Sequence, residues 1–384
     1  MEILYNLSVC QPVGNVKRHG GGIYGEIVFK RIVERGLPVS CYFDSQKWLN
    51  PEISELIHKN NIPLYDSNEF TLNDVAIKTS ADLFYSPMNT GFSGLNGCPC
   101  LVTIHGLRKL ELPKDLFFFK YKSSIKDKLK FVIKWIRTSH DRAKDYEYRT
   151  RLVNSKDKMF ITVSEHSRDA FKSYYPLLFK DKDIPVFYSP STIGNICINK
   201  RHFNEKFFLI VSAGIWAKNP LRAIIALDRL FSSGMLQDYC ARITGVSDPS
   251  IYKYKLQNPN KFHFMGYVDD DVLHQLFHDA YCLIYPSLNE GFGYPPVEAM
   301  SFGVPVIASS FSSISEICQN AALYLNPYSI EEIMNRIIKI TRPEVHFDYS
   351  ERARKRYTEV YKRQKEDLDG LIDYMYKLSS RKTD

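Results

Sequence analysis

The feature that most constrains the fold is the steady alternation of short apolar runs with longer amphipathic segments along the 384 residues. Apolar runs of about 4–8 residues have the length of buried strands, whereas segments with apolar residues three and four positions apart have the period of a helix that faces a core. Such alternation is typical of βαβ units, in which helices cover a parallel sheet. We therefore expect an α/β protein with parallel sheets.

The expected strands form two sets, separated by the polar stretch Ser189–Asn195, which contains a proline and a glycine and is typical of a linker. A chain of this length holds two cores. We expect two Rossmann-like domains facing a central cleft, at 1–190 and 196–350, and a helical tail at 351–384. Ligands of such domains bind beyond the carboxyl ends of the strands. The expected strands are Ile3–Val9, Val39–Phe43, Leu83–Tyr85, Leu101–Ile104, Met159–Val163, Phe207–Ser212, Ala241–Thr244, Phe262–Met265, Cys282–Tyr285, Val304–Ala308 and Ala322–Leu325.

Composition indicates a soluble protein of the cytoplasm. The chain is 44% hydrophobic and 24% charged, as in globular proteins, and its apolar runs are far shorter than the ~20 residues of a membrane span. The first residues lack the features of a secretory signal. Eight cysteines are scattered, and only Cys98 and Cys100 lie close together. This favours free thiols in a reducing compartment, and no second Cys or His pair at ligand spacing predicts a zinc site.

The net charge of +8 is concentrated between Glu111 and Arg151, where twelve Lys or Arg stand against six Asp or Glu. One interpretation is a solvated basic helix with a buried apolar stripe. The other is a surface that contacts an anionic membrane, at the inner face of the cell membrane, or gathers an anionic acceptor. No nucleic-acid-binding module surrounds the stretch, so we expect no nucleic acid partner. Its aromatic residues are Phe117, Phe118, Phe119, Tyr121, Phe131 and Trp135.

One segment of the second half combines a strand, a glycine turn and two carboxylates. The strand Cys282–Tyr285 runs into Glu290 and the turn Gly291-Phe292-Gly293, and a helix expected from about Pro295 contains Glu298. The glycines allow close approach of a ligand, and N–H groups at a helix start favour anionic or hydroxyl oxygens. Two carboxylates in one pocket can accept hydrogen bonds from sugar hydroxyls. The alternative is a capping carboxylate and a solvated helix glutamate.

Two further candidates follow strands. Lys218 and Asn219 come after the strand Phe207–Ser212 and before a helix, where a lysine can offer its charge to a diphosphate; the alternative is an ordinary loop lysine. His105 follows the strand Leu101–Ile104 at the expected ligand edge. Taken alone, a single histidine is more often structural.

Glycines also precede a helical segment near the N-terminus. Gly20 to Gly25 satisfy the pattern G-x-G-x-x-G, and Asp44 ends the next strand, as in a dinucleotide-binding fingerprint. That fingerprint follows its strand at once, whereas about ten residues separate Val9 from Gly20. We therefore favour a glycine turn in which Gly21 and Gly22 approach a diphosphate from across the cleft.

Three consecutive acids, Asp269 to Asp271, could indicate a metal-bridged diphosphate. They precede an amphipathic helix, whose start favours acidic residues. We therefore expect helix capping and no metal. The turn at Ser164 is likewise expected to cap a helix.

The segment from Tyr285 to Met300, YPSLNEGFGYPPVEAM, followed by GVPVI, resembles the signature of retaining group 1 (family 4) glycosyltransferases of GT-B fold. The resemblance extends upstream to Gly266–Asp269 and downstream to Ala321–Tyr324. It implies transfer of a hexose from a UDP- or GDP-sugar, without a further cofactor or metal, to a glycan or lipid-linked acceptor in bacterial-type surface polysaccharide assembly. It also implies a C-terminal helix that returns to the first domain. Alternatives are a non-catalytic or an epimerase-type nucleotide-sugar-binding protein of the same fold.

The resemblance assigns catalytic roles to His105, Lys218 and Glu290, with His105 beside the donor sugar and Lys218 at the diphosphate. Base recognition is expected near Gly245-Val246 and Tyr267-Val268, and Glu298 is expected to hold the ribose. The remaining residues implied to bind the donor are Gly21, Gly22, Asn219, Gly291, Phe292 and Gly293.

Two positions depart from the family pattern. The arginine that usually precedes the lysine is replaced by Ile215 or Trp216, and Gly106 stands where an aspartate usually follows the histidine. Either Lys218 neutralises the leaving group alone, or Arg222 or a residue of the first domain assists it.

Overall fold

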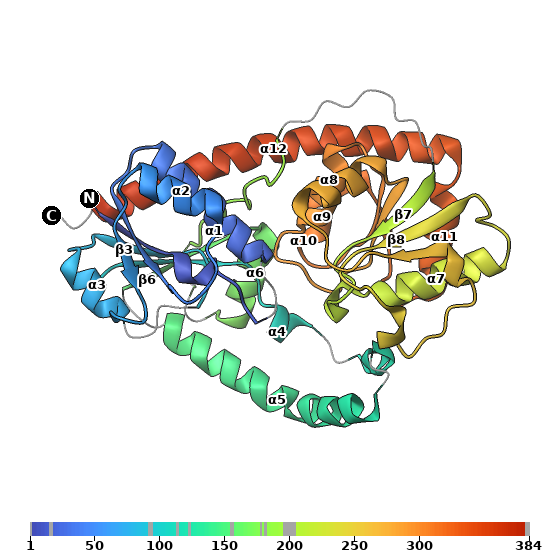
Figure 1. Ribbon diagram of the computed structural model, residues 1–384, viewed down its shortest axis with the longest axis horizontal. Coiled ribbons are helices and arrows are strands. Elements are labelled where there is room, and N and C mark those ends of the chain that lie inside the picture. The colour runs from blue at the N-terminus through green and yellow to red at the C-terminus, as the bar shows by residue number, and fades with distance from the viewer. Residues whose placement is uncertain are drawn as a thin grey trace. The chain divides into compact units, whose positions relative to one another are not determined.

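The computed structural model describes residues 2–14, 18–90, 95–112, 115–121, 124–153, 157–176, 179, 183–194 and 205–380. Asn195, the last residue of the expected linker, lies outside them, as do the side chains of Phe131 and Trp135. The chain divides into two compact units (Figure 1). Unit 1 comprises Met1–Leu107, Glu147–Thr192 and Lys362–Asp384, and unit 2 comprises Arg108–Tyr146 and Ile193–Tyr361.

Unit 1 contains a parallel six-stranded sheet in the order β3-β2-β1-β4-β5-β6. This is the order 3-2-1-4-5-6 of dinucleotide-binding folds. Its core includes Tyr5, whose ring packs against Phe29 at 5.2 Å and Tyr85 at 5.3 Å between centroids. The strands are β1 (Ile3–Asn6), β2 (Val39–Phe43), β3 (Leu64–Asp66), β4 (Leu83–Ser86), β5 (Cys100–Ile104) and β6 (Lys158–Thr162). The helices that lie wholly within it are α1 (Gly20–Glu34), α2 (Pro51–Lys59), α3 (Leu72–Lys78) and α6 (Glu165–Tyr174).

The expected glycine turn near the N-terminus is instead the first turn of α1. His19 caps this helix, because its Nδ1 accepts a 3.0 Å hydrogen bond from the Gly22 amide. A Cβ atom at Gly22 would lie 2.7 Å from the Cys10 carbonyl oxygen, and one at Gly21 would lie 2.9 Å from Met88 Sδ. Both glycines therefore allow the helix to pack closely against the loops that follow β1 and β4.

Unit 2 repeats the architecture, with a parallel six-stranded sheet in the order β12-β11-β10-β7-β8-β9. Counted from β7, this is again 3-2-1-4-5-6, read from the other edge. The expected α/β architecture with two Rossmann-like domains is thereby confirmed. The strands are β7 (Lys206–Ile210), β8 (Tyr239–Ile243), β9 (Phe262–Phe264), β10 (Cys282–Tyr285), β11 (Val306–Ser309) and β12 (Ala322–Leu325).

Helices cover both faces of this second sheet. Figure 1 shows α8, α9 and α10 on one side and α7 and α11 on the other. The expected capping at the start of α8 is confirmed, since Asp269 accepts a 2.9 Å hydrogen bond from the Val272 amide. The helices are α4 (Arg108–Glu111), α7 (Pro220–Ser232), α8 (Asp270–Asp279), α9 (Tyr294–Ser301), α10 (Ser313–Cys318) and α11 (Ile330–Ile340).

Two long helices, α5 (Ile125–Val153) and α12 (Pro343–Ser379), contribute residues to both units. The tail helix begins eight residues before the expected position 351 (351 − 343), and its part from Lys362 onward belongs to unit 1, where Asp369 pairs with Arg31 at 2.6 Å. The units also differ from the expected ranges in that Arg108–Tyr146 belongs to unit 2. Among the described residues, no helix has the length and apolarity needed to cross a membrane.

Candidate functional site

The candidate site in unit 2 lies where the strand order reverses, between β7 and β10. These two strands are neighbours, and the chain leaves them in opposite directions along the sheet, toward β8 and toward β11. Loops at such a switch point diverge and leave room for a ligand beyond the carboxyl ends of the strands. The loop after β7 carries Lys218, and the loop after β10 carries Glu290.

The structure brings Lys218 and Glu290 together as an ion pair, with 2.7 Å between Lys218 Nζ and Glu290 Oε1. The hydroxyls of Tyr285, at 2.7 Å, and Ser287, at 2.5 Å, also donate to Oε1. Lys218 Nζ donates in addition to the Tyr285 hydroxyl at 2.6 Å. The two charged side chains are only 12% and 6% exposed, so the pair is largely removed from water. The Glu290 amide donates to Ser312 Oγ, which fixes the backbone as well.

Burial and charge act against each other in this pair. Burial tends to raise the pKa of Glu290, but the charges of Lys218 and Arg108 and the hydrogen bonds from Lys218 and Ser287 lower that pKa overall. Burial lowers the pKa of Lys218, and Arg108 lowers it further, while the charge of Glu290 opposes both. At neutral pH Glu290 is thus an anion shared by two cations. A buried ion pair is stable only when its geometry and hydrogen bonds are good, and loss of one partner leaves a buried charge without compensation.

Arg108 is the second cation, with its Nη2 atom 3.3 Å from Glu290 Oε2. Its side chain is 42% exposed, far more than that of Lys218, so it marks the open side of the cluster. The short helix α4 holds it in unit 2: Leu112, just after the helix, packs with Ala217 and Leu288. Sequence reasoning missed Arg108, because nothing in its neighbourhood indicated that it leaves the first unit.

Arg222, proposed from the sequence as a helper of Lys218, has a different role. Its side chain is buried, pairs with Asp115 at 2.8 Å and stacks over the Phe117 ring at 3.8 Å. It also donates to Asn219 Oδ1 at 3.0 Å. Arg222 therefore anchors the segment around Asp115 and does not reach the cluster at Glu290.

Asn219 positions Lys218. It adopts a left-handed backbone conformation, with φ 57°, and its side chain is fully buried. Its Nδ2 atom donates to the carbonyls of Pro286, at 3.2 Å, and Pro327, at 2.6 Å. These bonds tie the loop after β7 to the loops after β10 and β12. Trp216, one of the two residues at the approximate place of the missing arginine, packs edge-on against Phe118 at 5.1 Å between ring centroids.

The glycine turn after Glu290 leads into α9. Gly293 has φ 101°, which only glycine adopts readily, and as N-cap it offers no side chain to the first-turn amides. The phenyl ring of Phe292 is buried, and its carbonyl accepts from Ser313 at 3.0 Å. Glu298 lies within α9, close enough for its charge to raise the pKa of Lys218. Glu290, Lys218 and Glu298 are thus brought into one electrostatic neighbourhood.

The residues expected to recognise the base lie on the loops after β8 and β9. Gly245 has φ 85°, and its amide donates to the Gly266 carbonyl at 2.5 Å. A Cβ at Gly214, on the loop after β7, would lie 2.8 Å from the Gly245 oxygen, so the glycine at 214 lets this loop touch the loop after β8. Tyr267 is 69% exposed, and Val268 is half-buried. These positions do not test whether the residues contact a nucleotide base, and their role stays a prediction.

His105 and the glycines of α1 lie in unit 1, at the carboxyl edge of its sheet. His105 Nε2 is 2.8 Å from the Pro87 carbonyl oxygen, and its ring packs edge-on against Tyr24 at 4.7 Å. Burial lowers the pKa of His105 to about 4, against the opposing effect of the Pro87 hydrogen bond. The ring is therefore neutral with its proton on Nε2, and the Pro87 carbonyl orients it in place of the carboxylate that Gly106 cannot supply.

The hydroxyl partners of Glu290 were also missed. Tyr285 and Ser287 belong to the segment that carries the family resemblance, but no role was assigned to them from the sequence. The sequence did contain a signal for them. A tyrosine and a serine at the end of a strand, five and three residues before a carboxylate, can donate hydrogen bonds to that carboxylate when the chain turns back. A carboxylate that must remain charged while buried needs such donors.

We expect the pH dependence of stability to reveal the neutral His105. As the pH falls from about 6.5 toward 4, the unfolded chain gains a proton on this ring that the native state does not, so the free energy of unfolding decreases. His105→Gln should remove this part of the slope, at most about 3 kcal/mol. Urea unfolding across this pH range measures it, with exposed His58→Gln as control. An unchanged slope in His105→Gln would contradict the assignment.

Lys218 and Glu290 lie within a part of the chain that matches a known family model. Residues 198–359 match the family model described as Glycosyl transferases group 1. The O-antigen chain mannosyltransferase RfbU of Salmonella typhimurium is 31% identical over 171 residues, which are 44% of this chain and 47% of that protein. The match thus spans about half the length of this curated relative.

Solved structures match almost the whole chain at low identity and therefore show the fold. A glycosyltransferase from Rickettsia africae ESF-5 has a TM-score of 0.66 at 16% identity, covering 98% of each chain. WaaG, a glycosyltransferase involved in lipopolysaccharide biosynthesis, has a TM-score of 0.65 at 16% identity, over 96% of this chain and 99% of that one. The resemblance to the group 1 glycosyltransferases is thereby confirmed over residues 198–359, which match that family's model, and the fold of the chain is that of GT-B glycosyltransferases.

Proposed function

We propose that the chain is a retaining glycosyltransferase that moves mannose from a UDP- or GDP-linked donor to a glycan or lipid-linked acceptor of a bacterial surface polysaccharide. The observation that carries the proposal is the cluster of Lys218, Glu290 and Arg108 at the switch point of unit 2. The sugar and the pathway are taken from relatives named as O-antigen mannosyltransferases, which match part of the chain.

The departing nucleotide diphosphate gains negative charge as the bond to the sugar breaks. Lys218 and Arg108 lie on the two oxygens of one carboxylate, so both cations are already held in the loops at the strand ends. A preorganised pair of this kind stabilises the leaving group without reorganisation at the moment of reaction. Arg108 therefore takes the place of the arginine missing near Gly214, and we propose that no metal is required.

Glu290 binds the donor sugar through its second oxygen. Oε1 is occupied by Lys218, Tyr285 and Ser287. Oε2 faces Arg108 on the more exposed side, where a sugar hydroxyl can donate to it. Glu298 and the amides of the turn ending at Gly293 complete the proposed contacts to the ribose and phosphates. A carboxylate held in this way binds the donor sugar and does not act as a nucleophile toward its anomeric carbon. We therefore propose that the configuration is retained through front-face attack by the acceptor hydroxyl.

Unit 1 supplies a polar hollow suited to the acceptor. It lies beyond the carboxyl ends of β1, β2 and β3, and its lining includes Ser8, Tyr42, Asn68 and Thr71. Hydroxyl and amide groups of this kind exchange hydrogen bonds with a polyol. We propose that a saccharide portion of the acceptor binds there.

The long helix α5 supports a peripheral location on an anionic membrane at the inner face of the cell membrane. Five apolar side chains are at least 37% exposed and recur at helical spacing: Ile125, Leu129, Val132, Ile133 and Ile136. This stripe is thus not buried, contrary to the first interpretation of the basic stretch. Exposed Lys126, Lys130 and Arg137 accompany it. An apolar stripe with basic residues beside it is typical of helices that lie at the interface of anionic lipid bilayers.

Turnover with a panel of UDP- and GDP-linked mannose and glucose tests the function. We expect nucleotide release that needs an acceptor, continues in the presence of EDTA, and yields a product with the donor's anomeric configuration. Glu290→Gln keeps the size of the side chain but removes the charge that holds Lys218, so the rate should fall by about 100-fold or more. Full activity of this variant would refute the proposed role. Isomerised donor without acceptor would indicate an epimerase, and donor binding without turnover a non-catalytic protein.

The role of Arg108 is tested separately by Arg108→Ala. Loss of one cation at the leaving group should lower kcat by about 100-fold, with a smaller change in KM, because the charge develops in the transition state. The exposed neighbour Lys109 is the matched control, and Lys109→Ala should retain most of the activity. Equal effects of the two substitutions would show that only the general positive charge of α4 matters.

Co-sedimentation with vesicles tests the contact between α5 and a membrane. We expect binding to vesicles containing phosphatidylglycerol, weakened by salt and absent with phosphatidylcholine alone. Ile133→Asp should weaken it, since it places a charge in the apolar stripe. Ile77→Asp, at an apolar position on α3 that is even more exposed, should not. Equal binding of both variants would argue against α5 as the contact surface.

A further inference from the structure

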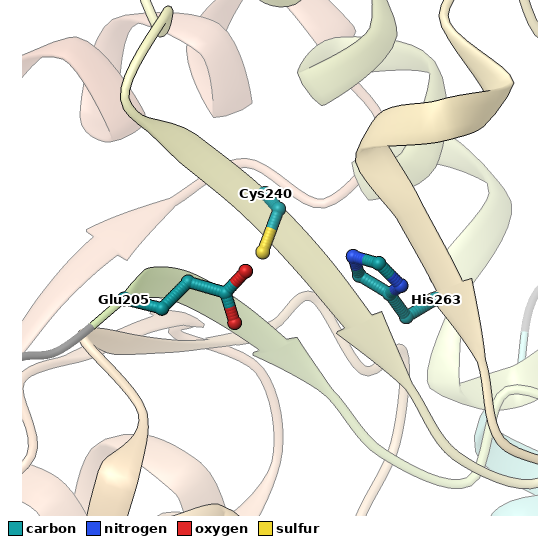
Figure 2. Close-up of side chains that lie close together, drawn as sticks. All are labelled: Glu205, Cys240 and His263. Carbon is teal, nitrogen blue, oxygen red and sulfur yellow. The ribbon is translucent and has the colours of Figure 1, made fainter.

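Three metal-binding side chains converge on the second sheet, away from the candidate site. Glu205 directly precedes β7, Cys240 is the second residue of β8, and His263 is the second residue of β9. Their donor atoms all lie within 4.8 Å of one another. Figure 2 shows the carboxylate, the thiol and the imidazole turned toward a common point. Glu205 and Cys240 are 35 residues apart in sequence (240 − 205), and Cys240 and His263 are 23 apart (263 − 240). These separations do not match the short spacing of common metal-binding motifs, so the sequence did not predict the site.

Strand register explains the convergence. In the parallel sheet, Cys240 lies opposite Phe207, and Arg242 lies opposite His263. Side chains two residues apart point to the same face, so Glu205 shares a face with Phe207, and Cys240 shares it with Arg242. Glu205 and His263 thus stand diagonally on either side of Cys240. The backbone of three neighbouring strands, and not only the side-chain conformations, sets the arrangement.

The set of donors fits a zinc-class ion. Thiolate, imidazole and carboxylate together are ligands of Zn²⁺, whereas Mg²⁺ and Ca²⁺ prefer oxygen alone. Cys240 is buried, while Glu205 and His263 are exposed, so an ion can enter from solvent and keep a fourth position for water. A site open on one side in this way is completed by a solvent ligand.

Arg242 orients the Glu205 carboxylate through an ion pair. Its Nη2 atom is 2.6 Å from Glu205 Oε2, and its guanidinium lies 4.2 Å from the centre of the Phe207 ring. This holds the carboxylate on the shared face and leaves Oε1 for an ion. Hydrogen-bonded ligands of this kind are common in metal sites. The negative charges of Glu205 and a Cys240 thiolate balance the divalent ion, and Arg242 does not need to be displaced.

We propose that Glu205, Cys240 and His263 form a binding site for a zinc-class divalent ion that joins β7, β8 and β9. The site lies at the amino ends of these strands, opposite the carboxyl edge at which the donor is proposed to bind. It is independent of glycosyl transfer. Its role is to cross-link three strands near their solvent-exposed amino ends. An ion that binds only the folded unit stabilises that unit.

Cobalt is the probe, since tetrahedral Co²⁺ absorbs in the visible and its bond to a thiolate absorbs in the near ultraviolet. The full chain, freed of metal with EDTA, is titrated with Co²⁺. We expect one equivalent with a thiolate band, displaced by Zn²⁺. Cys240→Ser should abolish the band, and His263→Ala should weaken binding by at least about tenfold. The control Cys98→Ser, in the segment Cys98-Pro99-Cys100 of unit 1, should change nothing.

Thermal unfolding provides the second readout. Zn²⁺ should raise the Tm of the wild-type chain and of Cys98→Ser, and should raise that of His263→Ala by less, because the variant binds the ion more weakly while its exposed side chain is not part of the core. Absence of a thiolate band at excess Co²⁺, or a band that persists in Cys240→Ser, overturns the proposal. Both measurements are made without donor or acceptor, so their result is separate from that of the transfer assays.

Discussion

A buried anion held by two cations organises the carboxyl edge of the second sheet. Glu290 is ionised although it is only 6% exposed, because Lys218 and Arg108 lie on its two oxygens and two hydroxyls donate to it. Removing one partner from such a pair costs on the order of 3–5 kcal/mol. The loops after β7 and β10 and the helix α4 must therefore keep their places for the charge to be tolerated. The same constraint holds the two cations in place for the diphosphate of the proposed donor.

The alternation of strands and helices predicted most of the fold, since burial on both faces of a parallel sheet leaves a strong apolar pattern. The strand β3 escaped prediction because Leu64–Asp66 is a short, partly exposed strand at the sheet edge, without an apolar run. The start of α1 was misplaced for a different reason. Glycines in sequence suggest a turn, whereas here the close approach of Cys10 and Met88 requires them inside a helix.

For the candidate site, the sequence predicted the residues that sit on the loops of the switch point, since strand ends can be read from the pattern. Lys218 and Glu290 were expected near one another, and they form an ion pair. Arg108 could not be found in this way, because its place depends on the packing of Leu112 against unit 2. The cluster of Glu205, Cys240 and His263 depends on strand register, which a single sequence does not encode in its spacing.

The assignment of Arg108–Tyr146 to unit 2 bears on how this chain can be recombined with a relative of the same fold. The sequence alone suggests an exchange of halves after Thr192, where the second segment of unit 1 ends. A hybrid built that way would combine Ile193–Tyr361 of unit 2 with another protein's version of Arg108–Tyr146. Arg222 would then lose Asp115, and Glu290 would lose Arg108, unless the other parent carried the same residues. The proposed donor site is thus not portable as one uninterrupted stretch of chain, and a hybrid that keeps it must carry two separate inserts.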